Sequence, residues 1–202
     1  MSIEMMVALG SAGAAAAIAF GAVGSALGTG AAGMAAIGAW KKCYAQSKAA
    51  PFQLLVFIGA PLTQTIYGMI LMNNIIGKLS LSSYLSKEVI QAAKDAAVAA
   101  EATTPSVITA GPAWLAHVPA ETLAAAKIAL SAGASSWPAM LMAGIIGGAA
   151  MGTSAWMQGR AGAAGSDALA ETGQGFANYL MTLGVVETVA LFVMVFIGAT
   201  LG

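Results

Sequence analysis

The sequence has very few charged residues for its length. Only 8% of its 202 residues are Asp, Glu, Lys or Arg, whereas a soluble domain has about 25%. Lysine and arginine together number 8, as do aspartate and glutamate, so the net charge is zero. This balance gives no support for nucleic-acid binding. Combined with 59% hydrophobic residues, it predicts a membrane protein.

Cysteine and aromatic residues are scarce as well. Cys43 is the single cysteine, so a disulfide within the chain is excluded, and we expect it to be a small apolar filler. Aromatic residues make up 7% of the chain, which argues against a large aromatic-lined cavity. The start, MSIEMM, has an acidic residue and no basic cluster, so we do not expect a cleaved signal peptide.

Long apolar runs are what the sequence has instead. Four of them exceed the ~20 residues that a membrane-spanning helix needs. They extend over residues 5–40, 49–77 and 128–159, and from the residue after Glu171 to the end. We therefore predict an all-α membrane protein with four transmembrane helices and both termini on the same side of the membrane.

The two halves of the sequence resemble each other. Each has a glycine-rich span, a short polar connection and a span of larger residues, and GTGAAG (28–33) matches RAGAAG (160–165). Glycines four residues apart allow helices to approach closely in lipid. Such glycines are Gly24 and Gly28 in one half and Gly144, Gly148 and Gly152 in the other. The pattern predicts tandem hairpins of the same orientation, with the first and third spans as closely packed inner helices.

Basic residues are enriched beside the two short connections. Lys41, Lys42 and Lys48 follow the first span, and Arg160 follows the third. Because basic residues favour the cytoplasmic side of a membrane, we expect the short connections to be cytoplasmic. Both termini and the long connection would then lie outside.

Glu187 lies near the middle of the last apolar run. A carboxylate at that depth costs about 2.5–3.5 kcal/mol on insertion scales. An acid within a membrane span is therefore a candidate ion or proton site.

Polar residues in the second span follow one helix face. Ala60, Thr63, Gln64 and Tyr67 have the spacing i, i+3, i+4, i+7. Pro61 has no backbone N–H, which leaves the carbonyl of residue 57 without its helical donor, and this predicts a loosened backbone near Ala60.

The third span adds Gln158 to these groups. Hydroxyl, amide and carbonyl oxygens with one carboxylate suit one small monovalent cation. Hydrogen bonds between helices would also explain Gln64 and Gln158, and packing or an interface position would explain Tyr67.

Three segments carry a resemblance to a known family. PLTQTIYG (61–68), MQGRAGAAG (157–165) and VETVALFVMVFI (186–197) resemble the proteolipid rotor-ring subunit of V/A-type ATPases, subunit K of the bacterial and archaeal enzymes. The resemblance covers about residues 5–77 and 140–202. It implies a ring of identical copies, in which the second hairpin keeps the ion-binding glutamate and the first has Leu62 near the equivalent position.

The resemblance also implies roles for individual residues. The sodium-type members bind the ion with groups that match Glu187, Gln64, Thr63, Gln158 and the backbone carbonyl of Ala60. A tyrosine that hydrogen-bonds the glutamate matches Tyr67. This complete oxygen set favours Na⁺, while H⁺ is the alternative cargo.

The same resemblance implies partners rather than catalysis by this chain. A stator membrane subunit would supply an essential arginine, and central-stalk subunits would contact the cytoplasmic connections. The copies would lie in a lipid bilayer and turn as ATP is hydrolysed elsewhere, or turn in the reverse sense for synthesis.

The long connection departs from the family, whose hairpins are joined by a short loop. The predicted organisation is a first hairpin (1–77), a helical insertion (78–135) and a second hairpin (136–202). Two helix-forming stretches within the insertion are separated by prolines, Pro105, Pro112 and Pro119. We expect an external helical hairpin on the outer face of the ring, with Trp114 and His117 as packed or solvated residues.

Two other classes of protein remain open at this point. A small four-helix exporter could exchange protons at Glu187 for a cationic drug, but it would need an aromatic-lined cavity and an inverted repeat. A purely structural membrane oligomer could use Glu187 for hydrogen bonds between helices. A closed ring of many copies would favour the rotor, and a dimer would favour the exporter.

Overall fold

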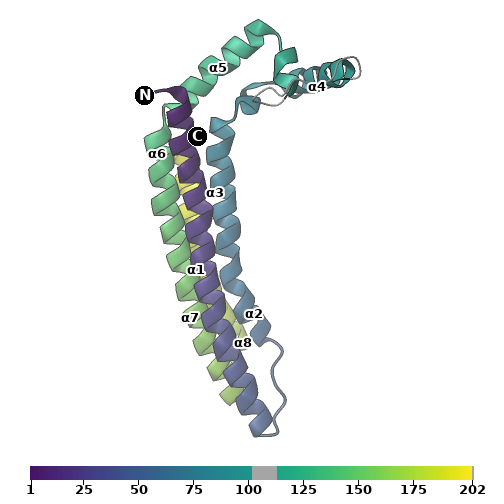
Figure 1. Ribbon diagram of the computed structural model, residues 1–202. Helices are drawn as coiled ribbons and strands as arrows, with labels where there is room; N and C mark the ends of the chain where they lie inside the picture. The colour runs from purple at the N-terminus through teal and green to yellow at the C-terminus, as the bar shows by residue number, and fades with distance from the viewer. Residues whose placement is uncertain (102–112, 202) are drawn as a thin grey trace.

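Figure 1 shows the computed structural model of the chain, a bundle of long helices with a smaller helical unit at one end. The structure describes residues 1–101 and 113–201. Every regular element in these two ranges is a helix, and they contain no strand. The all-α prediction is therefore confirmed. Pro105 and Pro112 lie outside the described residues.

The first hairpin consists of one unbroken helix and one interrupted helix. α1 (Ile3–Ala45) runs without a break. The second span, Leu54–Leu79, contains α2 (Leu54–Gly59), the short 3₁₀ helix η1 (Ala60–Leu62) and α3 (Thr63–Leu79). Both spans are long and apolar enough to cross a membrane.

The second hairpin has the same plan with a different interruption. Its first span, Trp137–Thr172, contains α6 (Trp137–Met142), the π-helical turn η4 (Ala143–Gly147) and α7 (Gly148–Thr172). α8 (Phe176–Thr200) is the last span. These two helices also have the length and composition of membrane spans, which confirms the predicted set of four.

The third span begins later than the apolar run that starts at residue 128, and close to residue 136, the predicted start of the second hairpin. Ile128 belongs to a separate helix, α5 (Ala120–Ala134), and the span itself starts at Trp137. The chain turns at Ser135 and Ser136, and Pro138 then occupies the first turn of α6, where a missing N–H costs nothing. Hydropathy alone missed this boundary because α5 is also apolar.

The inner helices also extend past their apolar stretches. Lys42 lies in α1, and Arg160 lies within α7, so the short connections are only residues 46–53 and 173–175. α7 ends where Gly173 adopts a left-handed conformation (φ 68°) and its N–H bonds the carbonyl of Leu169 at 2.8 Å. Lys42 therefore lies near the end of α1 and Arg160 well before the end of α7, while Lys48 lies in the first short connection.

Glycines bring α1 and α7 into backbone contact, as predicted. A Cβ atom on Gly24 would overlap the backbone of Gly152, and one on Gly159 would overlap the backbone of Gly28. Helices this close gain extensive van der Waals contact. α1 and α7 thus form the central pair, with α3 against α1 and α8 against α7.

Two apolar cores lie at different heights along the bundle. The core near the termini includes Leu71, Met140 and Met151. The core near the short connections includes Leu54 and Phe57, whose ring stacks on Phe176 with centroids 5.5 Å apart. Cys43 belongs to the second core and is 2% exposed, which agrees with its expected role as an apolar filler.

The insertion forms a helical unit with its own small core. It contains η2 (Leu81–Tyr84), α4 (Lys87–Glu101), η3 (Ala113–His117) and α5. The buried residues of this core are Leu85, Ala93, Val118 and Ala126. Trp114 packs against this core, while His117 is exposed.

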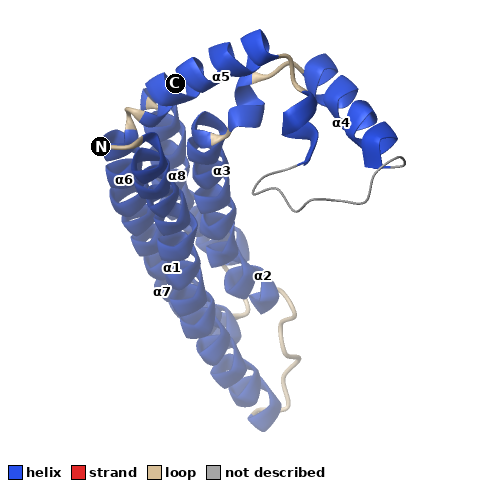
Figure 2. Ribbon diagram, turned by 45° about the horizontal axis from the view of Figure 1, so that its top comes forward, coloured by secondary structure: helices blue, strands red, loops and turns tan. Residues whose placement is uncertain are grey.

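The insertion lies at the end of the bundle that carries both termini (Figure 1). Figure 2 shows α5 crossing above that end, with α4 beyond α3. The hydroxyl of Tyr84 donates to the carbonyl of Lys78 at 2.9 Å, which joins the insertion to the end of α3.

Candidate ion-binding site

The candidate site lies where the second span, α7 and α8 meet, between the two apolar cores. Glu187 stands near the middle of α8, and Gln158 projects from α7. Ala60, Thr63 and Gln64 come from the interrupted helix of the first hairpin. The site is thus divided between the two hairpins of one chain.

Pro61 creates the local backbone that the site uses. α2 ends at Gly59, and η1 replaces the α-helix for one turn before α3 begins. Within this turn the carbonyl of Ala60 accepts both the N–H of Thr63 and its hydroxyl, the latter at 3.0 Å. The predicted disturbance of the helix near Ala60 is therefore present.

Two glutamines connect the hairpins. Both Gln64 and Gln158 are fully buried. The Nε2 of Gln64 donates to the Oε1 of Gln158 at 2.9 Å, while the Oε1 of Gln64 accepts from the hydroxyl of Thr63 at 3.2 Å. This chain of hydrogen bonds satisfies amides that would be costly to bury alone.

The carboxylate of Glu187 receives one donor from each hairpin. The hydroxyl of Tyr67 donates to Oε1 at 2.8 Å, and the Nε2 of Gln158 donates to Oε2 at 3.3 Å and to the carbonyl of Leu183 at 3.1 Å. The structure therefore brings together all the residues predicted for the site. Whether they bind an ion stays a prediction.

Gln158 was expected to bind the ion, but its hydrogen bonds give it a different role. It reaches Glu187 through its amide nitrogen, and its oxygen is occupied by Gln64. Gln158 thus holds the carboxylate as a donor, and its amide would have to turn to offer oxygen to a cation.

No basic side chain neutralises Glu187 among the described residues. The ion pairs found there are those of Lys42 with Asp167 and Glu171, at the far end of α1 and α7. The described residues also contain no cluster of three or more His, Cys, Asp and Glu side chains that could hold a metal ion. A single carboxylate with neutral oxygens nearby has a net charge of −1, which one monovalent cation or one proton would balance.

Two serines that the sequence pattern does not single out support the site. The hydroxyl of Ser154 donates to the carbonyl of Val186 at 2.9 Å, so Ser154 and Gln158 both bind the backbone of α8 next to Glu187. Ser25 accepts from Thr65 at 2.9 Å and fixes α3 against α1. In the sequence each is one more small residue in a glycine- and alanine-rich helix, so neither could be singled out before the structure.

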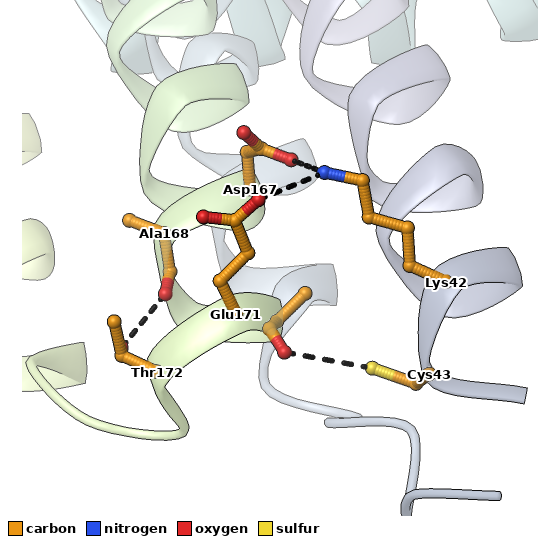
Figure 3. Close-up of polar contacts among 7 residues, drawn as sticks. Lys42, Cys43, Asp167, Ala168, Glu171 and Thr172 are labelled. Atoms are coloured by element: carbon orange, nitrogen blue, oxygen red, sulfur yellow. Dashed lines mark hydrogen bonds and ion pairs between the residues drawn. The ribbon is translucent and has the colours of Figure 1, made fainter. Parts of the chain in front are cut away.

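A charged cluster joins the same two inner helices at the end with the short connections (Figure 3). The Nζ of Lys42 lies 2.7 Å from Asp167 and 3.1 Å from Glu171. All three side chains are about half exposed or more. Exposed pairs of this kind contribute little to stability, but they fix the ends of α1 and α7 relative to each other.

The second hairpin has a recognisable sequence. Residues 141–197 match the family model of the ATP synthase C subunit. The match includes Gln158 and Glu187, so the second hairpin is similar to the ATP synthase C subunit over the part that contributes these two residues to the candidate site. The four long apolar helices agree with a membrane protein.

The match leaves the first hairpin and the insertion outside its range. Only the contacts in the structure therefore assign residues of the first hairpin to the site. These residues are Ala60, Thr63, Gln64 and Tyr67. Comparisons with curated proteins and with solved structures gave no match.

Proposed function

We propose that the chain is the rotor-ring proteolipid of a V/A-type ATPase and carries Na⁺ at Glu187. The observation that carries the proposal is the carboxylate near the middle of α8, held by Tyr67 and Gln158 without a basic partner in the described residues. The match of the second hairpin to the ATP synthase C subunit supports the rotor role.

The oxygens near Glu187 support Na⁺ over H⁺. A proton needs only the carboxylate and a few hydrogen bonds, whereas a sodium ion needs several oxygen ligands. The hydroxyl of Thr63 and the carbonyl of Ala60 lie together on the first hairpin and offer oxygens to it.

The same geometry suggests how the ion would be carried. With Na⁺ bound, Glu187 is neutralised and its site can face lipid at a tolerable cost; without Na⁺, the carboxylate must face water or an opposite charge. An arginine on a stator subunit would supply that charge as each copy passes. Rotation of a closed ring of copies would then move Na⁺ across the membrane, while ATP hydrolysis or synthesis takes place on other subunits.

The orientation belongs to the same proposal. The connections at residues 46–53 and 173–175 would be cytoplasmic and would contact the central stalk beside the cluster around Lys42. Both termini and the insertion would lie outside.

Carbodiimide labelling tests the proposal directly. This reagent modifies carboxyl groups in apolar surroundings, so Glu187 should be labelled in the purified protein and Na⁺ should slow the reaction. Glu187→Gln should abolish the label, while Glu171→Gln, at an exposed carboxylate, should retain it. Protection by protons with no effect of Na⁺ would instead establish a proton ring, and a dimer in place of a closed ring would contradict the rotor.

A further inference from the structure

Arg160 lies on the opposite face of α7 from the candidate ion site, at nearly the same height. It follows Gln158 by two residues, which is about 3 Å along a helix axis. Gln158 is buried against Glu187, whereas Arg160 is exposed. A guanidinium at the depth of the ion site is costly unless it meets an anion or water.

The described part of the chain offers Arg160 an aromatic ring but no carboxylate. Its guanidinium carbon lies 5.5 Å from the ring centroid of Trp156. Asp167 is seven residues further along α7, about 10 Å away along the axis, and it is paired with Lys42. Stacking on Trp156 leaves the N–H donors of Arg160 free to bind an anion.

An apolar groove begins beside this arginine. It has a volume of about 230 Å³ and lies between α1 and α7. Its larger lining side chains are Phe20, Val23, Leu27 and Trp156. Gly21 and Ser154, on other faces of these helices, contact α3 and α8. The groove therefore opens away from the outer helices.

The apolar stretch of the third span is shifted along the bundle relative to the apolar helix α8. From Trp137 to Gly159 it has no charged residue, and these residues rise about 34 Å, close to the ~30 Å of a bilayer core. Arg160 follows directly. α8, in contrast, has Glu187 near its centre, at the height where the apolar stretch of α7 ends. A lipid against the inner helices would thus place its headgroup near Arg160.

We propose that Arg160 binds the phosphate of an anionic phospholipid whose acyl chain occupies the groove beside Trp156. Arginine pairs with phosphate through two parallel hydrogen bonds, and the groove is apolar, as an acyl chain requires. The position of this lipid inside a ring rests on the proposed function, but binding to a single copy does not.

Phospholipids with brominated acyl chains provide the test, because bromine quenches tryptophan fluorescence on contact. The delipidated protein is titrated with brominated phosphatidylglycerol or brominated phosphatidylcholine in mixed micelles. We expect quenching by phosphatidylglycerol at lower lipid fractions, and Trp156→Phe should remove this component. Arg160→Gln should weaken it by about tenfold, the effect of losing a charge-assisted contact.

Matched variants separate the headgroup contact from the groove. Lys127→Gln removes another exposed cation, on α5, and should leave the titration unchanged. Ala149→Phe, which fills the groove, should reduce quenching although Arg160 remains. If Arg160→Gln does not assemble, Arg160→Lys replaces it in the titration. This variant keeps the charge but loses the paired hydrogen bonds to phosphate, so it should also weaken the quenching.

Three results would overturn the inference. The first is equal quenching by the two lipids, and the second is identical titrations for the wild type and Arg160→Gln. The third is displacement by inorganic phosphate together with no effect of Ala149→Phe, which would indicate a site for free phosphate.

Carbodiimide labelling of Glu187 in the same samples distinguishes failure of the lipid site from failure of the proposed function. Lipid selectivity without Na⁺-protected labelling contradicts only the proposed function. Na⁺-protected labelling without lipid selectivity contradicts only the lipid site.

Discussion

The two hairpins share one plan but contribute different chemistry. The first supplies neutral groups from a helix that Pro61 interrupts, whereas the second supplies the carboxylate of Glu187 from an unbroken α8. Leu62, which the family resemblance implies to be near the position equivalent to Glu187, is 51% exposed and apolar. The difference shows how two hairpins of similar plan can form one site with a single charge, because the second supplies the carboxylate and the first supplies the uncharged donor Tyr67.

Glu187→Gln tests this comparison with the largest expected effect. The amide keeps the shape but not the charge, so Na⁺ binding and ion translocation should be lost while the oligomer still assembles. Radioactive sodium binding to the purified oligomer measures the first, and size-exclusion chromatography checks the second. Leu62→Gln, the equivalent change on the first hairpin, should leave binding intact. Equal losses from both substitutions would refute the asymmetry.

Gln158→Ala removes the hydrogen bond that the second hairpin provides to its own carboxylate. A hydrogen bond to a charged group contributes about 1.5–3 kcal/mol, so Na⁺ affinity should fall about 10- to 100-fold. The control is Ser166→Ala, because Ser166 is buried in the same helix but bonds only the carbonyl of Gly162. Isothermal titration with Na⁺ distinguishes them, and unchanged affinity in Gln158→Ala would remove this residue from the site.

Gly24→Ala tests the contact that holds the hairpins together. The added methyl group would meet the backbone of Gly152, and overpacking of this kind costs about 1–3 kcal/mol. The thermal stability of the purified protein should drop. Gly30→Ala is the matched control, since a Cβ atom there meets nothing within 4 Å. A similar melting temperature for both variants would show that α1 and α7 are less tightly packed than described.

Thr63→Ala addresses the contribution of the first hairpin. Loss of one neutral hydroxyl should weaken Na⁺ binding by about fivefold, the effect of roughly 1 kcal/mol. Thr65→Ala removes a neighbouring hydroxyl that bonds Ser25 instead. If Thr65→Ala weakens Na⁺ binding as much as Thr63→Ala, the hydroxyl of Thr63 has no specific part in the site.

Lys42→Gln should have the smallest effect. Its pairs with Asp167 and Glu171 are exposed, and such pairs contribute about 0.2–1 kcal/mol in total stability. The loss should shrink as salt is raised, and thermal unfolding in low and high salt would detect it. Lys41→Gln provides the comparison at the adjacent lysine. A large, salt-independent loss would mean that this cluster holds the hairpins together more strongly than its exposure indicates.

Much of the site could be predicted because helix geometry is regular. The spacing of Thr63, Gln64 and Tyr67 is sufficient to put them on one helix face, and the cost of burying Glu187 makes it the candidate charged group of the site. Pro61 likewise predicts an altered backbone from its missing N–H.

Other features depend on information that is not local in the sequence. Ser154 looks like one more small residue in a close-packed helix until its distance to the carbonyl of Val186 is known. Gln158 could be placed in the site, but its use of nitrogen toward Glu187 depends on Gln64 occupying its oxygen. The apolar run starts at Ile128 although the third span starts at Trp137, since the apolar helix α5 and a membrane span have similar hydropathy.

α1 is a single rod of 43 residues, about 64 Å long, and it reaches from the Lys42 cluster to the end that carries the insertion. A torque applied at one end would therefore reach the other with little loss to bending. In the proposed ring, each insertion would circle the ring axis as the ring turns. The stator subunit would therefore have to leave the path of the insertions free, and attaching one insertion to a fixed support would stop the rotation of the ring.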